Sequence, residues 1–442
     1  MKTTAAVLSL AALSAGSALK QRATSLPAIE VKGNAFFAGS DRFYVRGVDY
    51  QPGGSSDVAD PIADADGCKR DIEYFKELGL NAIRVYTIDN TAEHDECMNA
   101  LADAGIYLIL DVNTPKYSLN RADPNPSYNA DYLQSLFATV DKFQGYTNTM
   151  AFFSGNEVIN DPETSATAPY IKAVTRDLRQ YIRNRGYRTI PVGYSAADVA
   201  ENRMETAQYM NCGTDDERSD FFAFNDYSWC DPSTFTTSGW DEKVKNFTDY
   251  GLPIFLSEYG CNTNTREFGE PASLYSTDMS SVYSGGLVYE YSQEPSNYGL
   301  VEISGDSVSP LPDFDVLKSA LAGTSSPEGD GGYNPTGGAS DCPAYSSPNW
   351  LVKSDALPSI PDGAKKYMTA GAGTGPGLAG AGSQNAGGAS TGTATAGSGA
   401  ATNTGSSGTN AAGILRPSEF SFAPLVCAAV VVVSSMLGAS LL

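Results

Sequence analysis

The stretch GCKRDIEYFKELGLNAIRVY, Gly67–Tyr86, is one example of the helix-and-strand alternation that decides the fold of this 442-residue chain. Its first part, Gly67–Leu78, is an amphipathic stretch that predicts a helix, and Ala82–Tyr86 is a short apolar run of the kind that forms a buried strand. In both directions from this stretch, short apolar runs alternate with longer amphipathic ones between Leu26 and Leu321. This alternation predicts an α/β fold with a parallel sheet, because helices connect the parallel strands of such folds.

Eight short runs are predicted as strands: Tyr44–Val48, Ala82–Tyr86, Tyr107–Val112, Ala151–Ser154, Thr189–Tyr194, Phe221–Phe224, Pro253–Ser257 and Gly286–Tyr291. Eight amphipathic stretches are predicted as helices: Gly67–Leu78, Thr91–Ala104, Asp131–Phe143, Ala168–Asn184, Val199–Met210, Trp240–Tyr250, Ala272–Tyr283 and Asp313–Leu321. This count over about 300 residues predicts a (β/α)8 TIM barrel. A doubly wound open sheet is the alternative, but no Gly-rich phosphate loop follows the first strand.

Charge and histidine content exclude several classes of function. The chain has 29 Lys and Arg against 51 Asp and Glu, a net charge of −22, whereas nucleic-acid binding needs a basic face. The single histidine, His94, excludes a His-rich zinc site and disfavours a Ser-His-Asp triad. His94 lies between Glu93 and Asp95 and is predicted to be a solvated surface residue. We expect neither a metal nor a cofactor.

The two ends of the chain predict its location. Residues 1–18 resemble a cleaved signal peptide, with Lys2 followed by an apolar run and small residues. Residues 369–410 have no charge and are rich in Gly, Ala, Ser and Thr, which predicts a flexible linker. Residues 411–442 resemble a glycosylphosphatidylinositol propeptide, with attachment at Asn410; a transmembrane anchor is the alternative. We therefore expect a barrel at 19–324 and an extension at 325–368, held on the outer leaflet of the plasma membrane or in a cell wall.

The cysteines predict a disulfide framework. Cys427 lies in the propeptide, so an even number of six remains in a secreted chain. Cys230 and Cys261 follow neighbouring strands, and Cys68 and Cys97 lie on the first two helices, so each pair is expected to bond. Elimination leaves Cys212 with Cys342, which would tie the extension to the barrel. A metal site is the alternative, but no close cysteine pair supports it.

Carboxylates and tyrosines follow the predicted strands, where an α/β barrel carries its active site. They are Asp49, Tyr86, Asp111, Asn156-Glu157, Asp226-Tyr227, Glu258-Tyr259 and Glu290-Tyr291. Two carboxylates across a sugar suit glycoside cleavage, and tyrosines offer faces and hydroxyls to sugars. A magnesium site is disfavoured, because it would usually hold a phosphorylated substrate that this acidic end would repel.

Several motifs give the chain a specific resemblance. FFSGNE at Phe152–Glu157 and FLSEYG at Phe255–Gly260 resemble the acid/base and nucleophile motifs of clan A retaining glycosidases. Nearly the whole chain resembles the fungal β-1,3-glucanosyltransferases of glycoside hydrolase family 72, the Gas/Gel/Phr group. The further motifs that carry this resemblance are GVDYQPGG at Gly47–Gly54, NAIRVYTID at Asn81–Asp89, LDVNTP at Leu110–Pro115, FNDYSWC at Phe224–Cys230 and VYEYSQEPSNYGLV at Val288–Val301.

The resemblance implies a role for each matching residue. Glu157 would be the acid/base, with a raised pKa in the free enzyme, and Glu258 the ionised nucleophile of a double-displacement mechanism. Glucan contacts are implied for Gln51, Tyr86, Asp111, Asn156, Asp198, Arg203, Tyr227, Tyr289 and Tyr298. The partners would be β-1,3-glucan donor and acceptor chains, bound by a monomer. Only Cys342 lies between Cys261 and the tail, so the Cys-rich carbohydrate-binding module of some members is predicted to be missing.

Some alternatives remain open at this point. A hydrolytic endo-β-1,3-glucanase or a mannanase would use the same two glutamates, and a non-catalytic glucan-binding wall protein would need neither. Tyr289 and Tyr291 share one strand face, so both can pack in the barrel instead of touching sugar. Arg84 is expected in the barrel wall beside an acid at the strand ends, as readily as on substrate. Asn246 begins a glycosylation sequon, Asn-Phe-Thr.

Overall fold

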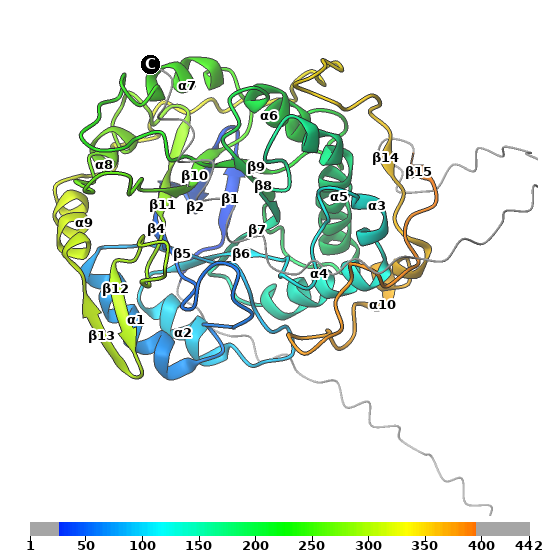
Figure 1. Cartoon of the computed structure of the whole chain (residues 1–442), viewed down its shortest axis with the longest axis horizontal. Helices are drawn as coiled ribbons and strands as arrows, with labels where there is room; N and C mark the ends of the chain where they lie inside the picture. The colour runs from blue at the N-terminus through cyan, green and yellow to red at the C-terminus, as the bar shows by residue number, and fades with distance from the viewer. Residues whose placement is uncertain (1–25, 395–442) are drawn as a thin grey trace, which may run out of the picture. The chain divides into compact units, whose positions relative to one another are not determined.

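A computed structural model describes residues 26–394 (Figure 1). The predicted signal peptide, Asn410, the propeptide and Cys427 lie outside these residues. Within the described part, no helix has the length and apolar character needed to cross a membrane.

The core of the fold is a closed barrel of eight parallel strands in the order β10-β11-β4-β5-β6-β7-β8-β9, which confirms the predicted (β/α)8 architecture. The strands are β4 (Val45–Asp49), β5 (Ala82–Val85), β6 (Tyr107–Asp111), β7 (Thr149–Asn156), β8 (Val192–Ala197), β9 (Phe221–Asn225), β10 (Ile254–Tyr259) and β11 (Tyr283–Val288). Figure 1 shows the helices arranged around this ring. They are α1 (Ala65–Glu77), α2 (Asp95–Asp103), α3 (Pro124–Ser127), α4 (Ala130–Phe143), α5 (Ala168–Asn184), α6 (Arg203–Asn211), α7 (Trp240–Phe247), α8 (Glu270–Leu274) and α9 (Pro312–Ala322).

Helix α1 illustrates how the sequence sets these elements. The carboxylate of Asp64 accepts a hydrogen bond of 3.2 Å from the Gly67 amide and so caps the first turn. Ile72 and Phe75 lie on the buried face of α1. This helix therefore begins at a polar cap and packs through one apolar face, as the spacing predicted.

Two predicted strands are shifted in the structure. The fifth begins at Val192, after Pro191, because proline has no amide hydrogen to donate to the sheet. The eighth begins at Tyr283 and ends at Val288, and the preceding helix α8 is shorter than predicted. Gly285 explains this second shift: a Cβ there would lie 2.0 Å from the Val45 oxygen, so the glycine lets β11 lie close to β4.

A small antiparallel sheet covers the N-terminal end of the barrel. Its strands are β1 (Ile29–Lys32), β2 (Ala35–Ala38) and β3 (Asp41–Phe43). The ring of Phe36 lies 5.9 Å from the rings of both Phe221 and Phe255, near the starts of barrel strands. This apolar cover places the functional site at the opposite, C-terminal end. A second hairpin, β12 (Val301–Ser304) and β13 (Ser307–Pro310), precedes α9.

The three predicted disulfides are present: Cys68–Cys97, Cys212–Cys342 and Cys230–Cys261. The first joins α1 to the start of α2, and the third joins the segments that follow β9 and β10. The second ties the extension to the segment after α6. The extension also contains η2 (Asp362–Ala364) and α10 (Tyr367–Ala370).

The predicted linker differs most from expectation. Residues 371–394, here called the C-terminal strap, lie along the barrel, and Figure 1 shows them beside α4 and α10. Lys116 donates to the Leu378 oxygen at 2.8 Å, and Asn129 donates to the Ser383 oxygen at 2.6 Å. The strap ends in β15 (Thr393–Ala394), paired with β14 (Leu357–Pro358). A charge-free sequence can dock in this way because polar barrel side chains bind its backbone.

The prediction for His94 is wrong. The side chain is buried, its Nε2 atom lies 2.7 Å from Oδ2 of Asp60, and its ring centroid lies 4.7 Å from that of Phe143. Polar sequence neighbours suggested exposure, but they do not expose His94: Glu93 accepts a hydrogen bond from Lys142 of α4, and Asp95 accepts one from Tyr146 just after α4. Its partner Asp60 is 34 residues away in the chain, a contact that local sequence does not reveal.

Candidate active site

Glu258 lies near the end of β10, where three donors surround its carboxylate. Tyr227 donates to Oε2 at 2.7 Å, Tyr86 donates to Oε1 at 2.8 Å, and Arg84 donates to Oε1 at 3.3 Å. The Glu258 residue is only 7% exposed. Three donors fix the orientation of this carboxylate and favour its charged form.

Glu157 directly follows β7 and is half-buried. Its Oε1 atom accepts a 3.0 Å hydrogen bond from Asn225, at the end of β9. Its backbone φ is 48°, a value that non-glycine residues rarely adopt. The Glu157 amide donates to the Ser195 oxygen at 2.9 Å, and Arg121 donates to the Glu157 oxygen at 2.8 Å. Neighbouring strands and a loop thus hold this acid in an unusual backbone conformation.

The two glutamates influence each other electrostatically. Burial is the main cause that raises the pKa of Glu258, to about 7, Arg84 opposes that rise, and the charge of Glu157 adds to it. From the sequence we expect an ionised Glu258 and do not predict this rise in its pKa, because no local sequence pattern shows that Glu258 is buried.

Arg84 is a fully buried cation among three acids. Its Nε atom lies 2.8 Å from Oδ2 of Asp111. Its Nη1 atom lies 3.3 Å from Oε1 of Glu258 and 3.9 Å from Oδ1 of Asp49. The structure therefore gives Arg84 the barrel-wall position with an acid partner. Burial raises the pKa of Asp49 well above its usual range, although the charge of Arg84 opposes the shift.

Tyr227, Tyr289 and Tyr298, here called the aromatic cluster, lie beside Glu258. Their ring centroids are 6.3 Å apart for Tyr227–Tyr289, 5.6 Å for Tyr227–Tyr298 and 5.3 Å for Tyr289–Tyr298, with edge-on geometry throughout. All three are partly exposed. Tyr291, by contrast, is buried and donates to Asp71 at 2.9 Å, so of the two tyrosines predicted on one face only Tyr289 joins the site.

The other predicted contacts occupy different positions. Asn156 accepts from Ser195 at 2.7 Å and from Asn225 at 3.1 Å, directly beside Glu157. Gln51 is buried, and its amide binds the Ala59 oxygen and the Tyr86 and Thr87 amides. Asp111 is buried against Arg84. Gln51 and Asp111 are thus buried residues that hold other residues of the site, Gln51 through the Tyr86 amide and Asp111 through the Arg84 side chain.

Asp198 and Arg203 form an ion pair with each other. The Nζ atom of Lys243, on α7, lies 2.7 Å from Oδ2 of Asp198 and 2.6 Å from Oδ2 of Asp226. The side-chain hydrogen bonds of this network include neither Glu157 nor Glu258, although the Asp226 amide donates to the Glu258 backbone oxygen at 2.8 Å. No sequence motif predicts a role for Lys243. Asn225 lies within the FNDYSWC motif, but it is not among the predicted site residues.

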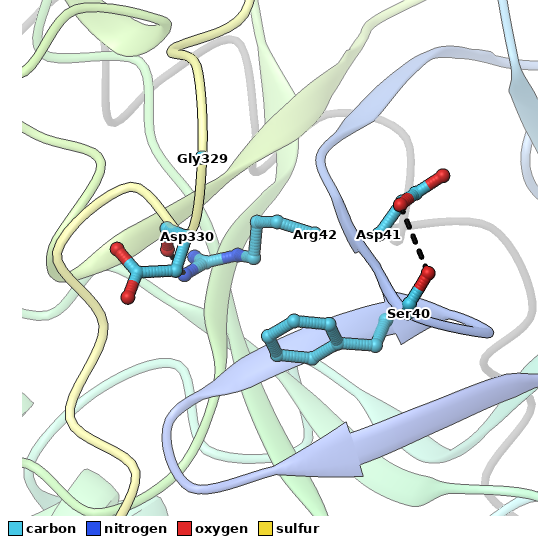
Figure 2. A pocket seen from close by; sticks show the side chains of 6 residues that line it. Ser40, Asp41, Arg42, Gly329 and Asp330 are labelled. Atoms are coloured by element: carbon cyan, nitrogen blue, oxygen red, sulfur yellow. Dashed lines mark hydrogen bonds between the residues drawn. The ribbon is translucent and has the colours of Figure 1, made fainter.

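A separate pocket lies at the N-terminal end of the barrel (Figure 2). It is lined by Phe37, Ser40, Asp41, Arg42, Gly329 and Asp330. Arg42 extends toward residue 330 and donates to its backbone oxygen at 3.1 Å. None of the predicted site residues lines this pocket.

Comparison with known proteins is consistent with this geometry. The family described as Glucanosyltransferase, Glyco_hydro_72, matches residues 18–325. The chain belongs to this family. This glucanosyltransferase is 73% identical to the 1,3-beta-glucanosyltransferase gel1 of Aspergillus fumigatus over 84% of this chain and 83% of that protein. It is 54% identical to the 1,3-beta-glucanosyltransferase GAS5 of Saccharomyces cerevisiae over 80% of this chain and 75% of that one.

Solved structures agree with the fold of the glucanosyltransferase. Saccharomyces cerevisiae Gas2p in complex with laminaritriose and laminaritetraose superposes with a TM-score of 0.71 at 38% identity. The match covers 76% of this chain and 77% of the Gas2p chain. The family match ends at residue 325, so it does not include the C-terminal strap.

Proposed function

We propose that this glucanosyltransferase cleaves β-1,3-glucan internally and transfers the new reducing end to the non-reducing end of another glucan chain. The observation that carries the proposal is the pair of differently held glutamates, with Glu258 bound by Tyr227, Tyr86 and Arg84 and Glu157 bound by Asn225. Relatives named 1,3-beta-glucanosyltransferases and Gas2p bound to laminari-oligosaccharides support the choice of glucan.

The reaction takes place in two displacements. In the first, Glu258 attacks the anomeric carbon, the glycosidic bond breaks, and Glu157 gives its proton to the leaving oxygen. This yields a covalent glycosyl-enzyme. In the second, Glu157 accepts the proton of an acceptor 3-hydroxyl, whose oxygen attacks the anomeric carbon and releases Glu258. If water replaces the acceptor, the outcome is hydrolysis.

The surroundings of each glutamate suit its role. The hydroxyls of Tyr86 and Tyr227 remain neutral because burial raises the pKa of both well above the usual value, so they donate to the Glu258 carboxylate. Asn156 uses its carbonyl oxygen toward Ser195 and Asn225, which leaves its amide nitrogen to donate to a sugar hydroxyl. The partly exposed rings of the aromatic cluster offer a surface for glucose rings.

Transfer requires that an acceptor sugar outcompete bulk water for the glycosyl-enzyme. Binding a hydroxyl in attack geometry achieves this, because a bound nucleophile has a high effective concentration. A purely hydrolytic endoglucanase does not need such a subsite. A non-catalytic wall protein is disfavoured, because both glutamates keep their hydrogen-bond partners.

The test uses purified protein and a laminari-oligosaccharide of defined length. Wild type should give products longer than the starting chain, whereas Glu157→Gln and Glu258→Gln should give none while unfolding at a similar temperature. Lys69→Gln is a control, because Lys69 is an exposed residue of α1. Products that are only shorter would indicate a hydrolase, and full activity of Glu258→Gln would refute the assignment.

The location is a further part of the proposal. We propose that residues 1–18 are removed, that a lipid at Asn410 holds the monomer at the cell surface, and that Asn246 carries glycan. Asn246 is exposed on α7, as a glycosylated residue must be. Phospholipase release of the protein from membranes, and its loss in Asn410→Gln, test the anchor; a retained membrane association would favour a transmembrane tail.

A further inference from the structure

Arg266 lies in the segment between β10 and α8 and is 3% exposed. Its Nη1 atom donates to the Tyr289 oxygen at 3.1 Å. Its Nη2 atom donates to the Tyr298 oxygen at 2.8 Å and to the Gly299 oxygen at 3.3 Å. One buried guanidinium therefore binds the backbone of two members of the aromatic cluster, although they lie nine positions apart in sequence.

Arg266 is itself held from the other side. Its Nε atom donates at 2.6 Å to Asp313, in the first turn of α9. The Cys230–Cys261 disulfide fixes the start of the same segment to the loop that carries Tyr227. Asn262 adds hydrogen bonds of 2.9 Å and 3.1 Å to the Ser296 and Asn297 oxygens. The loop bearing Tyr298 is thus attached to this segment at several points, in addition to the bond of 3.2 Å that the Glu290 amide donates to the Tyr298 oxygen.

The chemistry of this contact requires arginine. A guanidinium offers five donors in a planar fork, so it can bind several carbonyls and a carboxylate at the same time. A lysine ammonium has three donors at one atom on a flexible stem, and it cannot span the same set. Replacement by lysine would keep the charge but release at least one of the two tyrosine backbones.

We propose that Arg266 is a positioning residue that holds Tyr289 and Tyr298 as one surface for the acceptor sugar. This inference rests on the proposed transfer activity and deepens it. Glu258 has its own donors, Tyr227, Tyr86 and Arg84, and none of them is Arg266. Loss of Arg266 therefore acts on the partition of the glycosyl-enzyme between acceptor and water more than on its formation.

The experiment compares Arg266→Lys with Arg42→Lys. Arg42 is a matched control, because it also binds backbone oxygens, of Ser280 and Asp330, but at the far end of the barrel (Figure 2). The readouts are the ratio of elongated to hydrolysed products, the acceptor KM and the unfolding temperature. For Arg266→Lys we expect the ratio to fall by about tenfold, within the ~100-fold that a 1 Å misplacement can cost. Arg42→Lys should leave the ratio of elongated to hydrolysed products unchanged.

Two further variants keep the test decisive. Asp313→Asn leaves Arg266 in place but removes its charged partner, so a smaller fall in the same ratio is expected if Arg266→Lys proves poorly folded. Arg266→Lys should lower the ratio little further when Tyr289→Ala and Tyr298→Ala are both present, because both rings that Arg266 positions are then absent. An unchanged ratio in folded Arg266→Lys, or an undiminished effect of Arg266→Lys when both alanines are present, would overturn the inference. Absence of elongated products from wild type would instead refute the proposed function.

Discussion

The hydroxyl of Tyr227 lies 2.7 Å from Oε2 of Glu258, and the ring of the same tyrosine contacts Tyr289 and Tyr298. One side chain therefore joins the carboxylate proposed as the nucleophile to the surface proposed for the acceptor. Its phenol is a neutral donor, because burial raises its pKa well above the usual value.

Replacement of Tyr227 by phenylalanine tests this link. A hydrogen bond to a charged group contributes about 1.5–3 kcal/mol, so kcat should fall by roughly 10- to 100-fold. The bond from Tyr227 lowers the pKa of Glu258, so its loss raises that pKa. The acid limb of the kcat/KM profile, which follows ionisation of Glu258, should therefore move to higher pH. An acid limb that does not move would contradict the assignment of Glu258 as the nucleophile.

Asn225 should affect the other glutamate. It donates to Glu157 at 3.0 Å and to Asn156 at 3.1 Å. Asn225→Ala removes both bonds, and we expect kcat to fall by about tenfold, because one neutral hydrogen bond contributes roughly 1 kcal/mol and proton transfer also loses its fixed geometry. Single-turnover release of the leaving sugar is the measurement. A normal release rate would show that Glu157 does not depend on Asn225.

Glu290 should make stability depend on pH. Burial raises its pKa to about 8, with the nearby Glu294 charge adding to the rise, against 4.5 for an unperturbed glutamate. Below pH 4.5 both folded and unfolded states hold the proton, so the shift has no effect. Between pH 4.5 and 8 only the unfolded state releases it, so folded stability falls by up to about 1.4 kcal/mol per pH unit.

Glu290→Gln removes this titration. The unfolding free energy of the variant relative to wild type should therefore rise between pH 4.5 and pH 8, as urea denaturation at several pH values would show. Glu302→Gln is a control, because Glu302 is exposed on β12. A stability difference that is constant over this range would contradict the raised pKa.

The C-terminal strap allows a test with matched glycines. A Cβ at Gly375 would lie 2.1 Å from Asn90 Oδ1, and one at Gly380 would lie 2.2 Å from the Tyr117 hydroxyl, whereas one at Gly392 would meet Ser359 Oγ at an ordinary 3.5 Å. Gly375→Ala and Gly380→Ala should each cost about 1–3 kcal/mol of overpacking, with Gly392→Ala near neutral. Equal unfolding temperatures for all three would show that the strap does not contribute to stability.

The sequence predicted the barrel well, because its strands and helices follow from local patterns. Strand-end placement alone brings Glu157 and Glu258 to one end of a barrel, whereas their roles as acid/base and nucleophile come from the family resemblance and stay a prediction. The cysteine pairs followed from the same topology. The features that the sequence did not predict depend on contacts between distant segments. Examples are the contact of Asp60 with His94 and that of Arg266 with Tyr298.

The glycine-rich tail shows the limit of composition as a guide. Absence of charge and of large side chains is typical of linkers, and the same features let a backbone lie flat against polar groups on a barrel. Whether such a segment docks depends on residues such as Lys116 and Asn129, which lie more than 200 positions earlier in the chain.

Docking of the strap also shortens the length of chain that would link the barrel to the lipid proposed at Asn410. If the lipid is attached at Asn410, about 15 residues separate it from the last docked residue, in place of the roughly 40 of a linker that begins at residue 369. At ~3.5 Å per residue, the greatest reach falls from about 140 Å to about 50 Å. The catalytic end would then work on polymer close to the bilayer, and insertion of a spacer after residue 394 would extend its range without altering the fold.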